Sequence, residues 1–162
     1  MTALVLYDNF QEESLIPFII SFWNVHHSQM TPEQAKESLR EWVQDPYRLY
    51  VITCDSQAAG FLRTHASSST VCWIDDIYVD LPYRGKGVAS NAIGMFETEM
   101  RKEGYTSFCM EVVPDNLPAM RLYHRLGYDR LSMVVMRKDS DAFKSERIET
   151  IAGLEMRVRH FD

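Results

Sequence analysis

The spacing of hydrophobic residues predicts strands and helices that alternate along the whole chain. Apolar runs, several with a period of two, predict strands at residues 3–7, 47–54, 59–65, 71–80, 105–112, 128–136 and 154–161. Apolar residues three and four positions apart predict helices at residues 11–27, 31–43, 88–103 and 114–126. The order β-α-α-β-β-β-α-β-α-β-β predicts an α/β chain of the α+β type, with a mixed, mostly antiparallel sheet flanked by helices.

The start of the second helix is marked by a capping box. Thr31 supplies the capping hydroxyl, Pro32 occupies the first helical position and Gln34 completes the box. Length and composition fit one globular domain, because the chain has 162 residues, of which 46% are hydrophobic and 25% charged. We therefore expect a single domain over residues 1–162. Residues 140–162 form a C-terminal extension with a last strand, which would complete the sheet or join a homodimer.

The charge balance argues against a nucleic-acid partner. The chain has 17 basic and 23 acidic residues, a net charge of −6, whereas nucleic-acid binding depends on clustered Lys and Arg. The acidic excess is concentrated in residues 1–45, where seven acidic residues stand against two basic ones. If this segment lines a pocket, its negative potential favours a cationic ligand. The alternative is a solvated acidic face on two helices.

Cysteine usage and hydropathy predict a cytoplasmic protein without a metal centre or membrane contact. Cys54, Cys72 and Cys109 lie in apolar, strand-like runs and not at metal-binding or redox spacing. An odd number of cysteines is typical of a reducing compartment. Residues 1–10 lack the features of a secretory signal, and no apolar run approaches the roughly 20 residues that span a bilayer. We expect Cys72 and Cys109 in the core.

A glycine-containing turn between the strand at 71–80 and the helix at 88–103 carries the candidate chemistry. Glycine permits positive φ and leaves backbone N–H groups uncovered. Several such N–H groups at the start of a helix bind anions, helped by the helix dipole. A diphosphate therefore fits this turn, whose residues are Arg84, Gly85, Lys86, Gly87, Val88 and Ala89.

This turn and the motifs around it resemble the GCN5-related N-acetyltransferase family, known as GNAT. The turn matches the family signature Arg/Gln-x-x-Gly-x-Gly/Ala at Arg84, Gly87 and Ala89. The flanking motifs, which are closest to the small-amine and polyamine branch, are Ile74-Asp75-Asp76-Ile77-Tyr78-Val79 before the turn, and Asn116-Leu117-Pro118-Ala119-Met120-Arg121-Leu122-Tyr123 and Leu126-Gly127-Tyr128 after it.

The resemblance implies transfer of an acetyl group from acetyl-CoA to an amine by direct attack. In the family, the strand before the turn binds the pantetheine arm through its backbone, which corresponds here to Ile77, Tyr78 and Val79. The turn would hold the pyrophosphate. Asn116 would contact the pantetheine arm, and Tyr123 would lie near the thioester sulfur and protonate the leaving thiolate.

The amine must lose a proton before it attacks the thioester, and two adjacent aspartates are the candidate bases. An alkylamine with a pKa of about 10 is mostly protonated at pH 7. Asp75, Asp76 or a relayed water would take the proton. Both side chains face the acceptor only if the strand bulges. Polyamine-acetylating relatives have Glu-Asp here, and the shorter Asp75 favours the relay. Histone-acetylating relatives place the base two residues earlier, at Trp73, which makes that branch a poor match.

The first two helices wall the acceptor site in this family, which implies substrate-binding roles for His26 and Trp42 beside Asp75 and Asp76. Together with the acidic first 45 residues, the resemblance implies a small cationic amine as acceptor. Two other functions stay open: acetylation of a protein N-terminus or lysine, and a non-catalytic acyl-CoA-binding sensor. Asp75, Asp76 and Tyr123 favour the enzyme, because binding alone needs none of them.

Overall fold

The chain forms two compact units, Met1–Glu111 and Val112–Asp162. The computed structural model describes residues 1–25, 28–114, 116–136, 138, 146–151 and 153–159. Within these residues, no helix combines the length and the apolar character that crossing a bilayer requires.

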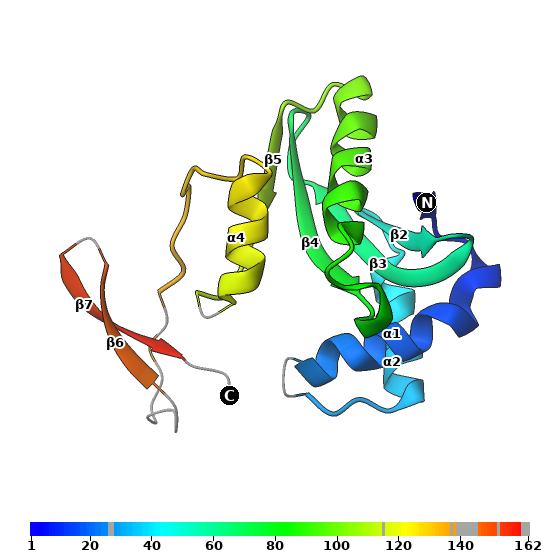
Figure 1. Ribbon diagram of the computed structural model, residues 1–162, viewed down its shortest axis with the longest axis horizontal. Coiled ribbons are helices and arrows are strands. Elements are labelled where there is room, and N and C mark those ends of the chain that lie inside the picture. Colours follow the sequence, from blue (N-terminus) through cyan, green and yellow to red (C-terminus); the bar gives the residue numbers. More distant parts are fainter. Residues whose placement is uncertain (26–27, 115, 137, 139–145, 152, 160–162) are drawn as a thin grey trace. The chain divides into compact units, whose positions relative to one another are not determined.

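A five-stranded sheet organises the first unit (Figure 1). The order across the sheet is β1 (Thr2–Leu6), β2 (Tyr47–Cys54), β3 (Gln57–Ala66), β4 (Val71–Val79) and β5 (Ser107–Met110). The first four strands pair antiparallel, whereas β4 and β5 run parallel. This mixed, mostly antiparallel sheet confirms the predicted fold class.

Three helices and two short 3-10 helices accompany the sheet. In chain order they are η1 (Asn9–Gln11), α1 (Glu12–Val25), α2 (Pro32–Trp42), η2 (Leu81–Tyr83) and α3 (Val88–Lys102). The predicted capping box of α2 is confirmed: the backbone N–H of Gln34 donates to Thr31 Oγ1 at 3.3 Å, and that of Thr31 donates to Gln34 Oε1 at 2.8 Å. Both N–H groups lie at a helix start, where they lack intrahelical partners.

The helices cover opposite faces of the sheet. α1 and α2 pack against the face that carries Leu49, Val51 and Phe61. α3 packs against the other face, where the rings of Phe96 and Tyr50 lie 6.0 Å apart. Because Tyr50 lies between Leu49 and Val51, the alternation of side chains along β2 assigns the two sets to opposite faces.

The second unit contains α4 (Leu117–Arg125) and a separate antiparallel pair, β6 (Glu146–Ile151) and β7 (Leu154–Arg159). α4 lies within the helix predicted at residues 114–126, and β7 lies within the strand predicted at 154–161. β6 was not predicted, because residues 140–150 are mostly polar and carry no clear hydrophobic period.

The strand predicted at residues 128–136 is wrong, because the structure has no strand there. Leu131, Val135 and Met136 are 83%, 82% and 73% exposed. Their local pattern suits a strand, but a strand requires a neighbouring edge to pair with its backbone. Among the described residues, no such partner is paired with this segment. β6, which was not predicted, lies later in the chain and pairs with β7 in a separate two-stranded sheet.

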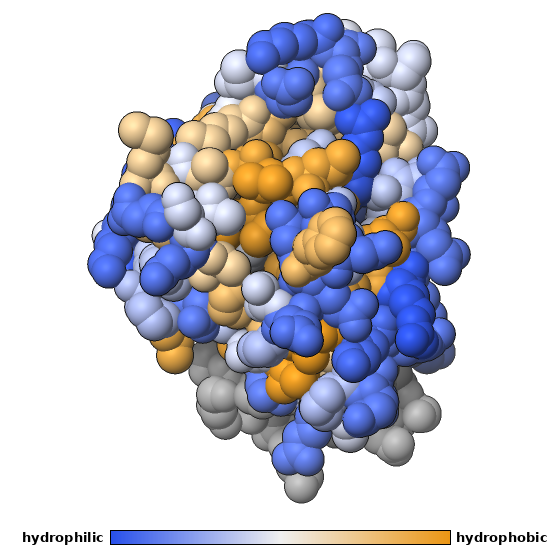
Figure 2. Space-filling view, turned by 90° about the vertical axis from the view of Figure 1, so that its right-hand side faces the viewer, coloured by the Kyte–Doolittle hydropathy of each residue, from blue (hydrophilic) through white to orange (hydrophobic). Residues whose placement is uncertain are grey.

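The surface seen in Figure 2 is mostly hydrophilic, and its apolar areas are interrupted by polar and charged residues. Single apolar side chains between charged ones are ordinary on a face exposed to water.

Candidate functional site

β4 contains a β-bulge at its two adjacent aspartates. Arg63 of β3 pairs with Asp76, and the register shifts directly beyond this pair, so that Asp75 is the additional residue. A bulge brings consecutive side chains to one face, where regular alternation would separate them. The two carboxylates do lie on one face, because their partners Arg63 and His65 are two residues apart on β3.

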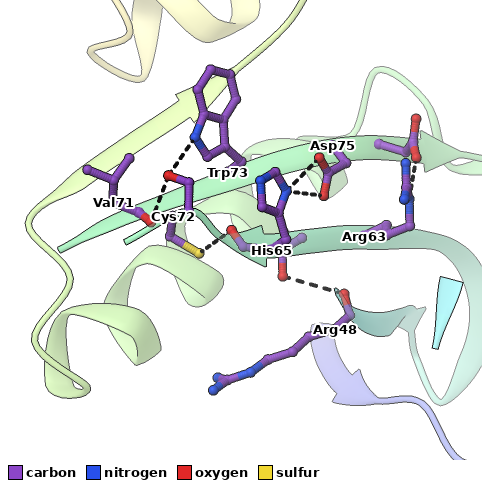
Figure 3. A network of polar contacts seen from close by, with 10 residues as sticks. Arg48, Arg63, His65, Val71, Cys72, Trp73 and Asp75 are labelled. Atoms are coloured by element: carbon purple, nitrogen blue, oxygen red, sulfur yellow. Dashed lines mark hydrogen bonds and ion pairs between the residues drawn. The ribbon is translucent and has the colours of Figure 1, made fainter. Parts of the chain in front are cut away.

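Asp75 is hydrogen-bonded to His65 on the neighbouring strand (Figure 3). Nδ1 of His65 lies 2.8 and 2.9 Å from the two carboxylate oxygens of Asp75. The imidazole is parallel to the Trp73 ring, with centroids 6.2 Å apart, and the Tyr47 ring approaches it at 5.8 Å with a steep tilt. Asp75 is thus one half of an Asp–His pair whose imidazole is packed between two aromatic rings.

Asp76 forms an ion pair with Arg63. Nε of Arg63 donates to Oδ2 of Asp76 at 2.6 Å. The guanidinium carbon lies 5.1 Å from the ring centroid of Trp42 and 4.7 Å from that of Tyr47, which are favourable cation–π distances. Trp42 itself is buried against Phe61, and its contact with Arg63 places the cluster on the face covered by α2. The predicted substrate contact of Trp42 stays a prediction.

The two pairs give this face a net negative charge. Arg63 contributes one positive charge, and Asp75 and Asp76 contribute two negative charges, so the formal total is −1 when His65 is neutral. The four side chains are between 16% and 26% exposed. Partial burial weakens screening by solvent, which strengthens the field that a cation would meet here.

A second acidic feature lies beside the C-terminal end of α1. A hollow of about 400 Å³ is lined there by eight of the described residues, among them Trp23, Met30, Glu37 and Glu41. Both glutamates belong to the acidic segment of residues 1–45. This part of the acidic segment therefore lines a shallow, open hollow.

The C-terminal half of β4 has an edge that is not paired with a strand (Figure 1). β5 pairs with residues 71–74 of β4, whereas β3 pairs with β4 as far as Val79. Among the described strands, none continues the pairing of β5 along residues 75–79. Backbone groups of Ile77, Tyr78 and Val79 that point to this edge can therefore bind an extended ligand in the manner of an added strand.

The turn between β4 and α3 has the geometry of an anion-binding nest. Gly85 and Gly87 have φ values of +72° and +77°, which other L-residues adopt only at a cost of about 1–2 kcal/mol. Gly87 caps α3 without a side-chain bond, and the first turn of the helix has no acidic residue. Among the described residues, Asn91 is the first of the helix whose backbone N–H donates to a backbone carbonyl. Its nitrogen lies 2.9 Å from the carbonyl oxygen of Gly87. The preceding N–H groups are free to face an anion.

Two basic side chains flank this nest. Nε of Arg84 donates to the carbonyl of Val79 at 2.7 Å, and its guanidinium lies 5.4 Å from the centroid of the Tyr78 ring. Nζ of Lys86 donates to the carbonyl of Pro82 at 2.7 Å. Both cations are held next to the turn by backbone carbonyls, and they supply local positive charge in a protein with a net charge of −6.

The second unit carries the two remaining predicted site residues. Asn116 caps α4, because its Oδ1 accepts a hydrogen bond from the backbone N–H of Ala119 at 3.2 Å. Burial raises the pKa of Tyr123, so its phenol stays protonated through the neutral range. The capping role explains Asn116 at the start of α4 without a ligand. The predicted contacts of both residues with the cofactor stay predictions.

Cys72 does not add a reactive nucleophile to the site. Cys72 is buried, as predicted, and burial raises the pKa of its thiol to about 11, which disfavours the nucleophilic thiolate. Cys109 is only partly buried, which departs from the predicted core position. His26 lies outside the described residues. In the described part of the chain, no group of three or more His, Cys, Asp or Glu side chains is arranged to hold a metal.

Arg63 and His65 belong to the cluster, although neither lies in one of the sequence motifs that indicate chemistry. The feature that could have pointed to Arg63 and His65 is their separation by two residues on one strand, directly after a stretch of β3 that is fully buried. A charged side chain on a largely buried sheet face requires a partner. The acidic pair on the next predicted strand, Asp75 and Asp76, offered such partners.

Comparison with known proteins adds a family match and one curated relative. The model of the family described as "Acetyltransferase (GNAT) family" matches residues 11–128. The relative, "Uncharacterized N-acetyltransferase YycN" of Bacillus subtilis (strain 168), is 28% identical over 87 residues. This alignment covers 52% of the chain and 56% of the relative, so the chain matches little more than half of that protein's length.

Solved structures share the fold at low sequence identity. A probable acetyltransferase has a TM-score of 0.74 and 19% identity, and the match covers 86% of this chain and 99% of that one. The aminoglycoside N-acetyltransferase AAC(6')-Iy, solved in complex with CoA, has a TM-score of 0.70 and 17% identity, covering 87% and 96%. The same enzyme is known with the bisubstrate analog CoA-S-monomethyl-acetylneamine. At these identities the similarity establishes the fold alone.

Proposed function

The chain belongs to the GNAT family of N-acetyltransferases. We propose that it transfers an acetyl group from acetyl-CoA to the primary amine of a small cationic acceptor. The observation that carries the proposal is the β-bulge of β4, which brings Asp75 and Asp76 to one face. Both aspartates directly precede the strand segment and the turn that would hold acetyl-CoA.

The turn before α3 fits the diphosphate of acetyl-CoA. The positive φ of Gly85 and Gly87 leaves backbone N–H groups uncovered, and the positive end of the α3 dipole stands behind them. Arg84 and Lys86 add charge beside the turn. The complex of AAC(6')-Iy with CoA, a protein of the same fold, supports this choice of cosubstrate.

The unpaired edge of β4 fits the pantetheine arm. From the turn, the arm would run back along Val79, Tyr78 and Ile77 toward the bulge. A strand advances about 3.3 Å per residue, so each residue passed brings the thioester closer to the level of Asp76 and Asp75. A backbone N–H at this edge would polarise the thioester carbonyl as the amine attacks.

The leaving thiolate receives its proton from Tyr123 in this proposal. The raised pKa of Tyr123, caused by burial, keeps the phenol protonated at the pH where the amine reacts. The amine attacks the thioester directly, and no residue is acylated. This agrees with Cys72, whose thiol is buried and whose pKa is raised to about 11.

Charge favours a small polycation as the acceptor. The cluster of Arg63, Asp75 and Asp76 has a formal charge of −1 with His65 neutral. The hollow beside α1 adds Glu37 and Glu41. AAC(6')-Iy, with the same fold, binds an analog that joins CoA to acetylneamine. Diamines, polyamines and aminoglycosides fit this chemistry.

The test is the rate of CoA-thiol release from acetyl-CoA with a panel of acceptors. The panel contains a diamine, an aminoglycoside, glutamate and a short peptide with a free N-terminus. The proposal predicts that kcat/KM is highest for the diamine or the aminoglycoside and at least about tenfold lower for glutamate, because the site attracts cations.

Three other results would contradict the proposal. A preference for the peptide would favour a protein acetyltransferase. A preference for glutamate would show that the acidic residues do not select the acceptor. Tight binding of acetyl-CoA without release of thiol for any acceptor would favour a non-catalytic acyl-CoA sensor.

A further inference from the structure

We propose that His65 is the base that removes the proton from the acceptor amine, and that Asp75 is a positioning residue that holds its imidazole. This inference rests on the acetyl transfer proposed above. It replaces the direct action of Asp75 or a relayed water, because Asp75 is already engaged by the imidazole through both of its carboxylate oxygens (Figure 3).

The hydrogen bond to Asp75 fixes which nitrogen of His65 is basic. An ionised carboxylate only accepts hydrogen bonds, so Nδ1 carries the hydrogen and donates it at 2.8 Å. In the neutral imidazole, Nε2 then holds the free lone pair. Among the described residues, none forms a hydrogen bond with Nε2. The side chain keeps 26% of its surface exposed, so Nε2 is available to a ligand.

Packing holds the imidazole in one orientation. The ring of Trp73 lies parallel to it, with 9° between the planes, and the Tyr47 ring stands at 72° to it. Figure 3 shows His65 with Trp73 and Asp75 on one side of the sheet, while the side chain of Arg48 extends away from them. An oriented base avoids the loss of rotational freedom that a mobile side chain would suffer during proton transfer.

The position of His65 on β3 places it beside the part of β4 toward which the acetyl end of the cosubstrate would extend. His65 lies opposite Trp73 and is bonded to Asp75, whereas Arg63 lies opposite Asp76. An amine attracted by Asp76 would therefore lie one residue along β4 from Asp75, whose partner His65 carries the basic nitrogen.

The proton balance of the step is complete without any further reactant. The acceptor ammonium gives one proton to Nε2 of His65 and becomes a neutral amine. The nitrogen lone pair forms the C–N bond, and the C–S bond breaks with its electron pair moving to sulfur. Tyr123 gives its proton to the thiolate, and the second proton lost by nitrogen passes through solvent to the resulting phenolate, so that Tyr123 is neutral again. The imidazolium, stabilised by Asp75, then releases its proton to solvent.

An imidazole suits this task better than a carboxylate. Ordinary imidazole binds a proton with a pKa of about 6.5, compared with about 4 for a carboxylate and about 10 for an alkylamine. Proton transfer from the ammonium to an imidazole is therefore less unfavourable than transfer to a carboxylate.

The test compares His65→Gln with the wild type, using acetyl-CoA and spermidine or kanamycin, whichever the wild type acetylates. We expect kcat to fall about 100- to 1,000-fold, with the KM for acetyl-CoA and the melting temperature nearly unchanged. His124→Gln, which changes an exposed histidine on α4, is the matched control and should keep the wild-type rate.

The pH profile separates a base from a structural residue. The groups that face His65 are Asp75 and Trp73 on β4 and Tyr47 on β2, with Arg63 and Asp76 at the next strand position. The wild-type kcat should fall on the acid side as His65 becomes protonated. His65→Gln should lack this acid limb. Asp75→Asn should lower kcat about 10- to 100-fold, because the imidazole loses the carboxylate that holds its orientation.

Nitrogen NMR of the wild-type histidines gives a second measurement that needs no variant. We expect the neutral His65 ring to carry its proton on Nδ1. A proton on Nε2, a kcat of His65→Gln within threefold of the wild type, or a wild-type acid limb in that variant would overturn the inference. If the wild type acetylates no amine, the proposed function fails as well; if it does and His65→Gln matches it, only the role of His65 fails.

Discussion

At the scale of single residues, Asp75 and Asp76 are adjacent and chemically identical, but their partners differ. Asp76 is paired with Arg63, whose charge does not change with pH. Asp75 is paired with His65, which is charged only when protonated. The negative potential of this face therefore depends on Arg63, which is always positively charged, and on His65, which is positively charged only when protonated. The bulge that brings the two carboxylates together is what makes this difference useful at a single site.

Gly87 provides the sharpest residue-scale test of the cosubstrate site. Gly87→Glu forces a side chain into a position with φ of +77° and places a negative charge at the proposed diphosphate. Acetyl-CoA should raise the melting temperature of the wild type, far more than NAD or ATP does, and should leave that of the variant unchanged.

Gly104→Glu is the matched control for this variant. Gly104 also has positive φ, +100°, and a side chain there would enter open space, but it lies after the C-terminal end of α3. The backbone strain is similar, at about 1–2 kcal/mol, without contact with the nest. If both variants lose the acetyl-CoA shift equally, strain and not the nest explains the loss.

Tyr123 is predicted to act through its hydroxyl group. Tyr123→Phe should lower kcat about 10- to 1,000-fold with little change in acetyl-CoA binding. Tyr105→Phe removes a hydroxyl elsewhere and should be neutral. Because the pKa of Tyr123 is raised, the neutral phenol stabilises the fold below about pH 10, and this contribution is lost as the pH rises through the raised pKa. An unchanged kcat with lower thermal stability would assign Tyr123 to packing.

At the scale of elements, the proposed cofactor edge depends on how closely β3 approaches β4. A Cβ on Gly60 would lie 1.9 Å from the carbonyl oxygen of Tyr78 and 3.0 Å from the Cα of Val79. Only glycine permits this approach, which holds the proposed cofactor edge of β4 in place. The chain thus uses a residue without a side chain on β3 to position a backbone segment on β4.

Gly60→Ala should therefore destabilise the protein and weaken acetyl-CoA binding together. We expect a loss of about 3 kcal/mol or more in the free energy of unfolding, measured by urea denaturation, because backbone must move to admit the methyl group. Gly94→Ala, at an exposed position within α3 where a Cβ meets open space, should instead stabilise by about 1 kcal/mol. Equal stabilities of the two variants would contradict the close approach.

The sequence predicted most elements of the first unit, because their signals are local. The capping box at Thr31 fixed the start of α2 to the residue, and the helical spacing located α3. From the sequence, a bulge at Asp75 could be stated only as the condition under which both carboxylates face the acceptor. The bulge itself depends on the register between two strands. The strand expected at residues 128–136 failed for the same reason: pairing is decided by a partner edge and not by the segment alone. The His65–Asp75 pair likewise needs that register.

At the scale of the whole molecule, the charge distribution favours cationic acceptors. The net charge of −6 is unevenly spread, with an excess of acidic residues in residues 1–45 and basic residues at the turn before α3. An anionic cosubstrate and a cationic acceptor would thus be drawn to different parts of the molecule. Such long-range attraction raises the rate of encounter and is screened by salt.

The KM for a polycationic acceptor should therefore rise with ionic strength. Between about 20 mM and about 500 mM salt the Debye length falls from about 20 Å to about 4 Å, so we expect an increase of at least about threefold. The KM for a neutral primary amine should change little over the same range. A salt-independent KM for the polycation would show that the acidic residues are solvated and do not act on the acceptor.

The central claim, direct transfer of acetyl from acetyl-CoA to a cationic amine, is tested most directly by mass spectrometry of the reaction mixture. The protein is incubated with acetyl-CoA and an aminoglycoside or a diamine. We predict one acetylated amine for each CoA released, with the mass of the protein itself unchanged, because no residue is acylated. Release of CoA without an acetylated amine, or an acetyl group retained on the protein, would contradict the claim.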